Sequence, residues 1–133
     1  MQAVNAKVSR PLNVGSFVDS CDNSGAKLLK IFSVVQHKTR KGKLPCAGVG
    51  DLVMASVKKG RPDMRKKTVL AIIVRQKKEF RRPDGTRIKF EDNAAIVVKD
   101  NKGNPQGSLI KGPVAKEVTE RWPLVSKFVK IMA

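Results

Sequence analysis

Short apolar runs rich in Val, Ile and Leu, separated by turn-forming residues, are the main pattern along this chain. Runs of this length that are rich in β-branched residues and bounded by Gly, Asn and Asp are typical of strands. The turns are clearest at Asp22-Asn23-Ser24-Gly25 and at Asp100-Asn101-Lys102-Gly103. The pattern predicts five strands: Ser16 to Cys21, Lys27 to His37, Asp51 to Val57, Thr68 to Lys78 and Ala94 to Lys99.

Strands at this spacing predict a mostly β fold built on a small five-stranded β-barrel. Closure removes exposed sheet edges, and a small twisted barrel is filled by its own Val, Ile and Leu side chains. The C-terminal part of the chain differs, because Gly112-Pro113 places a proline at a helix start. Two short helices are predicted there, from Val114 to Glu120 and from Pro123 to Val129, with Trp122 and Phe128 packing them onto the barrel.

The segment from Arg75 to Asn93, RQKKEFRRPDGTRIKFEDN, is predicted to form a protruding β-hairpin with one apolar and one cationic face. Pro83-Asp84-Gly85 suits its turn, because proline presets φ and glycine accepts the left-handed conformation that closes a short loop. With Arg82 opposite Thr86, the alternation of side chains along a strand fixes the other pairs. These are Phe80 with Ile88 and Lys78 with Phe90 on the packed face, and Arg81 with Arg87 and Glu79 with Lys89 on the other.

Arg81 and Arg87 are directly opposed in this predicted hairpin. Like charges at opposed positions destabilise an isolated hairpin, so an external anion is a sensible partner for the two arginines. The alternative is a solvated sheet edge whose charges only prevent aggregation.

The net charge of the chain is strongly positive, since 28 Lys and Arg against 11 Asp and Glu leave +17 on 133 residues. Self-repulsion of this size is usually balanced by nucleic acid, whose condensed counterions are released when Lys and Arg neutralise its phosphates. Three short segments hold 17 of the 28 positive charges: Lys38 to Lys43, Lys58 to Lys67 and Arg75 to Lys89. This concentration favours a nucleic-acid-binding protein.

Aromatic side chains are few, at 5% of the chain with no Tyr. Phe17, Phe32 and Phe90 are expected in the core, which argues against a surface that stacks single-stranded bases. A-form RNA needs no such surface, because proteins contact it largely through phosphates and 2′-hydroxyls. Gly48-Val49-Gly50 has the G-x-G spacing of a nucleotide loop, but a predicted strand follows it, so a tight turn between barrel strands is expected.

No catalytic residue, metal site or cofactor is predicted. Cys21 and Cys46 are isolated thiols that are expected as small core residues, and His37 is the single histidine, too few for a four-ligand metal site. Asp92-Asn93 is expected in a turn, since no histidine or second buried carboxylate is placed to act with it. An enzyme such as a nuclease would need clustered carboxylates and is the least favoured class.

The length predicts one domain over residues 1–133, and no internal linker rich in Gly, Pro and Ser divides it. We expect an N-terminal extension (1–11), a barrel with a basic loop and ribbon (12–111) and a C-terminal helical region (112–133). No stretch approaches the roughly 18 to 20 consecutive apolar residues that span a bilayer, and no secretory signal is recognised. An intracellular protein that does not bind membranes is therefore expected.

Four motifs occur in the order typical of one protein family: Asp22 to Ala26 (DNSGA), Ala47 to Asp51 (AGVGD), Ala71 to Asn93 and Gly112 to Glu117 (GPVAKE). From about Leu12 to its end, the chain resembles the family of large-subunit ribosomal protein fourteen. Val57 to Lys67 and Glu120 to Val125 are similar to the archaeal and eukaryotic branch of that family.

The resemblance implies a five-stranded barrel with a protruding β-ribbon and a small C-terminal helical region, at the face of the large subunit that meets the small subunit. It implies a structural constituent of the cytoplasmic ribosome that binds large-subunit rRNA and contacts small-subunit rRNA at an intersubunit bridge. Neighbouring large-subunit ribosomal proteins and initiation factor six are the implied protein partners. The alternative function is a free barrel-type single-stranded nucleic-acid-binding protein, which would expose aromatic side chains.

The candidate rRNA-binding residues are the Lys and Arg side chains of the three basic segments. Arginine engages phosphate in bidentate fashion, whereas lysine acts as a mobile point charge. The set is Lys38, Arg40, Lys41, Lys43, Lys58, Lys59, Arg61, Arg65, Lys66, Lys67, Arg75, Lys77, Lys78, Arg81, Arg82, Arg87 and Lys89.

Overall fold

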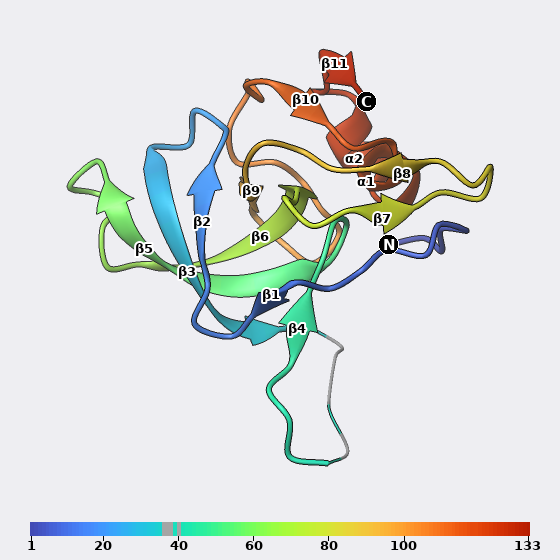
Figure 1. The fold of residues 1–133 in the computed structure, drawn as a ribbon. Helices are drawn as coiled ribbons and strands as arrows, with labels where there is room; N and C mark the ends of the chain where they lie inside the picture. The colour runs from blue at the N-terminus through green and yellow to red at the C-terminus, as the bar shows by residue number, and fades with distance from the viewer. Residues whose placement is uncertain (36–38, 40) are drawn as a thin grey trace.

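A closed five-stranded barrel forms the centre of the protein in a computed structural model that describes residues 1–35, 39 and 41–133 (Figure 1). Neighbouring strands pair antiparallel, except that β9 and β2 pair parallel where the barrel closes. The five-stranded barrel predicted from the sequence is confirmed. In order around it lie β2 (Phe17–Ser20), β3 (Ala26–Val34), β5 (Leu52–Gly60), β6 (Thr68–Arg75) and β9 (Ala94–Val98).

All five barrel strands differ from their predicted bounds, by one residue in β2 and β9 and by up to three residues in β3, β5 and β6. β5 continues past Val57 to Gly60, and β6 ends at Arg75 instead of Lys78. β3 ends at Val34, while the last two residues of its predicted range, 36 and 37, lie outside the described residues. The extension of β5 reflects its pairing with β3 as far as Ala26↔Gly60, which depends on a neighbouring strand and not on local sequence.

Two hydrophobic clusters explain why β6 and β9 read as nearly continuous apolar runs. Ala71 and Ile73 of β6 face the barrel interior with Leu29 and Ile31 of β3. Ile72, between them, faces outward into a second cluster that the C-terminal region covers. Strands buried on both faces lose the alternation of polar and apolar residues.

Three short strand pairs and two helices complete the fold. β1 pairs with β4, the hairpin β7–β8 crosses the helical region, and β10 pairs parallel with β11 (Figure 1). The elements are β1 (Leu12–Asn13), β4 (Cys46–Ala47), β7 (Phe80–Arg81), β8 (Arg87–Ile88), β10 (Pro113–Val114), α1 (Lys116–Arg121), α2 (Pro123–Ser126) and β11 (Ile131–Met132).

The predicted start of the first helix is wrong. Pro113 and Val114 form a strand, Ala115 is still extended at ψ 139°, and the helix begins at Lys116. Pairing with β11 and a hydrogen bond from Ala115 N to Val74 O at 3.2 Å hold this segment extended, so tertiary contacts override the local proline signal. The proline at a helix start is Pro123, in α2.

Trp122 joins the helical region to the barrel, as the sequence predicts. Its ring is fully buried in the second cluster, and its Nε1 donates a hydrogen bond to Gly50 O at 2.8 Å. Phe128 packs partly buried against the same cluster. The indole therefore ties α1 and α2 to the loop that precedes β5.

The prediction that Phe17 and Phe32 lie in the core is wrong. They are 54% and 45% exposed, whereas Phe90 packs partly buried against the second cluster. Alternation along β2 and β3 turns Val18 and Ile31 inward and leaves both rings on the outer face of the barrel.

Cys21 is buried and Cys46 is half-buried in β4, and neither forms a disulfide. Burial raises the pKa of the Cys21 thiol to about 11, so this group stays protonated at neutral pH. No helix in the described part of the chain is long and apolar enough to cross a membrane.

Candidate nucleic-acid interface

The hairpin β7–β8 has the predicted register at its tip. Phe80 pairs with Ile88 and Arg81 pairs with Arg87. Phe80 is buried in the second cluster with Ile88 packed against it, while Arg81 and Arg87 are both exposed. The hairpin therefore has the apolar and cationic faces that its sequence predicts.

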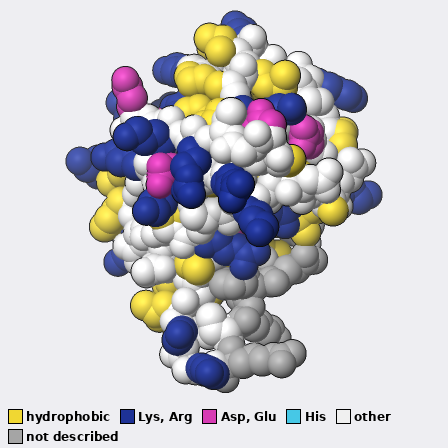
Figure 2. Space-filling view, turned by 45° about the vertical axis from the view of Figure 1, so that its right-hand side comes forward, with side chains coloured by type: hydrophobic (Ala, Val, Ile, Leu, Met, Phe, Trp, Pro, Cys, Tyr) yellow, Lys and Arg dark blue, Asp and Glu magenta, His cyan; other side chains and the backbone are white. Residues whose placement is uncertain are grey.

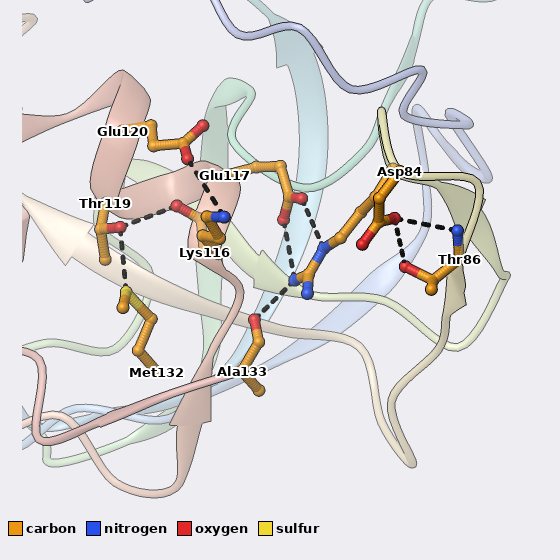
Figure 3. Close-up of polar contacts among 9 residues, drawn as sticks. Asp84, Thr86, Lys116, Glu117, Thr119, Glu120, Met132 and Ala133 are labelled. Carbon is orange, nitrogen blue, oxygen red and sulfur yellow. Dashed lines mark hydrogen bonds and ion pairs between the residues drawn. The ribbon is translucent and has the colours of Figure 1, made fainter.

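The turn of the hairpin is set by Asp84, Gly85 and Thr86. Gly85 has φ +91°, a left-handed conformation that favours glycine, and its N donates to Arg82 O at 2.9 Å. Asp84 Oδ1 accepts hydrogen bonds from the Thr86 hydroxyl at 2.7 Å and the Thr86 N at 2.9 Å (Figure 3). These two bonds lower the pKa of Asp84.

The pairing expected nearer the base of the hairpin does not form. Phe90 N donates to Gln76 O at 3.0 Å, which breaks the register that would oppose Lys78 with Phe90 and Glu79 with Lys89. Gln76 is fully buried; its Nε2 donates to Lys78 O at 2.8 Å and its Oε1 accepts from Val49 N at 2.9 Å. The hydrogen bonds of the Gln76 amide therefore hold the base of the hairpin, where the predicted strand pairs do not form.

Arg75, a candidate rRNA-binding residue, is only 8% exposed and binds other parts of the protein. Its Nε and Nη2 lie 2.8 and 3.2 Å from the two carboxylate oxygens of Asp92. Its Nη1 donates to Lys111 O at 3.0 Å and Pro113 O at 2.9 Å. The guanidinium therefore joins the hairpin base to β10 and is not presented to an external phosphate.

Arg82, a second candidate, is also used internally. Its Nε lies 2.8 Å from Glu117 Oε1 and its Nη2 lies 3.3 Å from Glu117 Oε2, with side-chain exposures of 15% for Arg82 and 4% for Glu117. Its Nη2 also donates to Ala133 O at 2.6 Å. Figure 3 shows Glu117 and Ala133 converging on this one guanidinium.

The remaining candidates of the hairpin are exposed. Arg87 has one ion pair, 3.4 Å from Glu79, in which both side chains are well exposed, so the pair contributes little. Lys77 and Lys89 line a groove of about 980 Å³ at the base of the hairpin, beside Phe90 and Pro113. We call the exposed side chains Lys77, Lys78, Arg81, Arg87 and Lys89 the arm cations.

One further cation joins the hairpin from the N-terminal extension. Lys7 forms a bridge with Arg81, in which Lys7 N donates to Arg81 O at 3.1 Å and Arg81 N donates to Lys7 O at 3.4 Å. Lys7 is exposed. Lys7 is not among the residues predicted from the sequence, and no local signal indicates it, because Lys7 and Arg81 are 74 positions apart in the chain.

The described end of the basic loop, residues 41–45 before β4, projects away from the barrel (Figure 1). Its candidates Lys41 and Lys43 are exposed, whereas Lys38 and Arg40 lie outside the described residues. Figure 2 shows Lys and Arg side chains gathered across the middle of one face, with others at the end of this loop.

The third group of candidates, from Lys58 to Lys67, lies at the end of β5 and in the β5–β6 turn, away from the hairpin. In Figure 1 the β5–β6 turn and the tip of the hairpin are at opposite sides of the molecule. Arg61 is partly engaged there, with its Nη2 donating to Ser24 O at 3.0 Å and its Nε 3.8 Å from Asp63. The exposed candidates of this group are Lys58, Lys59, Arg61, Arg65, Lys66 and Lys67.

The G-x-G sequence is a tight internal loop, as predicted. Gly48 N donates to Asp51 Oδ2 at 2.8 Å, and a Cβ at Gly48 would lie 2.2 Å from Ser9 O. Gly50 has φ +87° and its N donates to Ile73 O at 2.8 Å. These amides serve the fold and do not form a phosphate cradle.

Metal ligands do not gather in the described part of the chain. No group of three or more His, Cys, Asp or Glu side chains there is arranged to hold a metal ion. His37 lies outside the described residues.

The comparison with protein families shows to which family the chain belongs. The family model described as ribosomal protein L14p/L23e matches residues 11–132. The chain belongs to this family. It is therefore a structural, non-enzymatic ribosomal protein, with its place on the ribosome in the cytoplasm.

Close relatives in the L14p/L23e family are archaeal. The chain is 51% identical to the large ribosomal subunit protein uL14 of Methanothrix thermoacetophila over 132 residues, 99% of both chains. It is 50% identical to the same protein of Nanoarchaeum equitans and 51% identical to that of Methanococcus vannielii, again over 99% of both chains. These matches agree with the archaeal and eukaryotic resemblance of the sequence.

Proposed function

We propose that this chain is a constituent of the large ribosomal subunit that binds large-subunit rRNA through the arm cations and Lys7. The supporting observation is the pair Arg81 and Arg87, which are directly opposed and both exposed on a hairpin whose other face is buried. An RNA backbone supplies the negative charge that relieves this repulsion.

Arg75 and Arg82 have a different role in this proposal. Their guanidinium groups are bound to carboxylates and carbonyl oxygens of the protein, so they hold the hairpin in place. The rRNA contacts are then made by the exposed candidates, and the shape of the surface sets which RNA backbone fits.

The small-subunit contact is a separate part of the proposal. Residues 41–45, which carry Lys41 and Lys43, project from the barrel, and exposed lysines on a projecting segment suit a bridge to small-subunit rRNA. Neighbouring ribosomal proteins and initiation factor six remain proposed protein partners by family resemblance.

The first experiment is sedimentation of a tagged copy through sucrose gradients at low and high salt. The proposal expects the chain to remain with large subunits at high salt, because many phosphate contacts act together within an assembled particle. Recovery at the top of the gradient would favour the alternative, a free single-stranded nucleic-acid-binding protein.

A second experiment separates rRNA binding from subunit joining. Lys41→Gln with Lys43→Gln should leave the chain in large subunits while reducing their association with small subunits. Normal association would remove the intersubunit part of the proposal and leave the rRNA part intact.

A further inference from the structure

The groove of about 980 Å³ at the base of the hairpin has the size of a ligand site, and we call it the hairpin groove. Its volume is at the upper end of the roughly 300 to 1,000 Å³ that is usual for such sites. Apolar, cationic and carboxylate side chains line it together, supplied by Phe90 and Pro113, by Lys77 and Lys89, and by Glu91 and Asp92. The groove therefore combines an apolar wall with charges of both signs.

One wall of the hairpin groove is held in place by the buried Arg75 guanidinium. Arg75 Nη1 donates to Lys111 O at 3.0 Å and to Pro113 O at 2.9 Å. Gly112, between these two residues, has φ +79°, and a Cβ there would lie 2.7 Å from Arg75 Nη1. The segment 111–113 therefore packs directly against the guanidinium, and this wall is already formed in the free protein.

Three charged side chains of the groove take part in no ion pair among the described residues: Lys77, Lys89 and Glu91. Asp92 differs, because both of its carboxylate oxygens contact Arg75. Phe90 is only partly buried, so part of its ring remains accessible from the groove. These groups suit a ligand that carries an anionic group, a flat apolar face and hydrogen-bond donors.

A nucleotide extruded from RNA has all three of these features. Its phosphates pair with Lys77 and Lys89, and its base stacks on Phe90, as unpaired RNA bases stack on aromatic side chains. A carboxylate accepts hydrogen bonds and donates none, so Glu91 selects a base with donor groups on its edge. Guanine presents two adjacent donors there, N1–H and the 2-amino group, which match the two oxygens of one carboxylate.

We propose that the hairpin groove holds a single unstacked guanine nucleotide of the large-subunit rRNA. The inference rests on the proposed function and deepens it, because it adds one base-specific contact to a surface that otherwise binds phosphates. The low aromatic content of the chain agrees with it, since one ring serves one base. An acidic peptide fits the groove less well, because its carboxylates would meet Glu91 with like charge.

The first test compares binding of the trinucleotides UpGpU, UpIpU and UpUpU to the free chain at one salt concentration. All three carry the same number of phosphates, so a difference in affinity reports the central base. UpGpU should bind about ten-fold more tightly than UpUpU, as expected for one bidentate contact to a base. UpIpU, whose central base lacks the 2-amino group, should lose most of this advantage. Equal binding of UpGpU and UpUpU would overturn the inference.

Glu91→Gln tests the carboxylate itself. This variant replaces an exposed side chain with one of the same shape, so it should keep its thermal unfolding but lose the preference for UpGpU. The matched control is Glu79→Gln, which removes the same charge from the same hairpin outside the groove and should keep the ten-fold ratio. A preference that survives Glu91→Gln would contradict the assigned contact.

Kethoxal probing tests the contact in assembled large subunits, because this reagent attacks guanine at N1 and at the 2-amino group. In subunits that carry the Glu91→Gln chain, one guanine should become several-fold more reactive, and the Glu79→Gln control should leave the pattern unchanged. The proposal fails if no guanine changes. It also fails if dimethyl sulfate shows the change at an adenine or a cytosine instead.

Failure of this inference differs from failure of the proposed function. If the groove holds no guanine but the arm cations bind rRNA, an rRNA fragment still binds with a salt-dependent affinity while the trinucleotides show no base preference. If the chain binds no large-subunit rRNA fragment at all, the proposed function is wrong and the inference is wrong with it.

Discussion

Arg82 of the hairpin and Glu117 of α1 form a bidentate ion pair with atom distances of 2.8 and 3.3 Å. The two residues are 35 positions apart and both side chains are largely buried. Arg82 also binds Ala133 O, and Ala133 N donates to Val114 O at 2.9 Å. One guanidinium thus connects the hairpin, a helix and the C-terminal strand pair.

Arg82→Ala is expected to destabilise the protein by roughly 3 kcal/mol or more, because it leaves the buried Glu117 carboxylate without its partner. Urea unfolding measures this free energy. The matched control is Arg87→Ala, which removes an exposed arginine of the same hairpin and should change stability by less than about 1 kcal/mol. Equal effects of the two substitutions would mean that the Arg82–Glu117 pair does not hold the hairpin.

Arg81→Gln with Arg87→Gln should weaken rRNA binding while leaving the fold intact. Each phosphate contact that is lost lowers the slope of log affinity against log salt by up to about 0.9, a value taken from duplex DNA. Titration of an rRNA fragment at several salt concentrations measures the slope.

The control for this prediction removes the same charge from another region. Lys102→Gln with Lys127→Gln changes two exposed lysines outside the hairpin and should alter the slope less. An identical change in both variants would indicate that net charge alone, and not the hairpin, determines the affinity.

Ile72→Ala and Ile73→Ala should each destabilise the protein by about 2 to 5 kcal/mol, because both side chains are fully buried on opposite faces of β6. Phe17→Ala removes a larger side chain but should cost much less, since that ring is 54% exposed. Thermal unfolding of the three variants tests the two-cluster core. A small effect at Ile72 would show that the C-terminal region does not cover the outside of β6.

The raised pKa of the Cys21 thiol predicts that the protein loses stability in alkaline solution. Burial raises its pKa from 9.0 in the unfolded chain to about 11 in the folded protein. Because the folded state favours the protonated thiol, its stabilising effect is complete below pH 9 and is lost as pH rises toward 11. The expected loss is on the order of 2 kcal/mol, since one pKa unit corresponds to about 1.4 kcal/mol.

Cys21→Ser isolates this effect, because the hydroxyl does not titrate and the lysines are common to both proteins. The difference in unfolding free energy between the two proteins should narrow or reverse from pH 9 to pH 11. A difference that stays constant over this range would show that Cys21 does not titrate with a raised pKa.

Local chemistry was sufficient to predict the barrel and the tip of the hairpin. The apolar runs and the turns between them predicted all five barrel strands, with errors only at their ends. The pairing of Arg81 with Arg87 followed from the turn at Gly85 and the two-residue period of a strand. Such features are determined by residues that are close together in the sequence.

Tertiary structure alone decided which charged and aromatic residues reach the surface. Arg81 and Arg82 are neighbours in sequence, yet Arg81 is exposed and Arg82 binds Glu117. Phe17 has an outer position on β2 that no described element covers, whereas Ile72, also on an outer face, is covered by the C-terminal region. Exposure depends on what packs over a position, and a guanidinium is engaged only if a distant carboxylate folds beside it, so neither property is contained in the local pattern of residues.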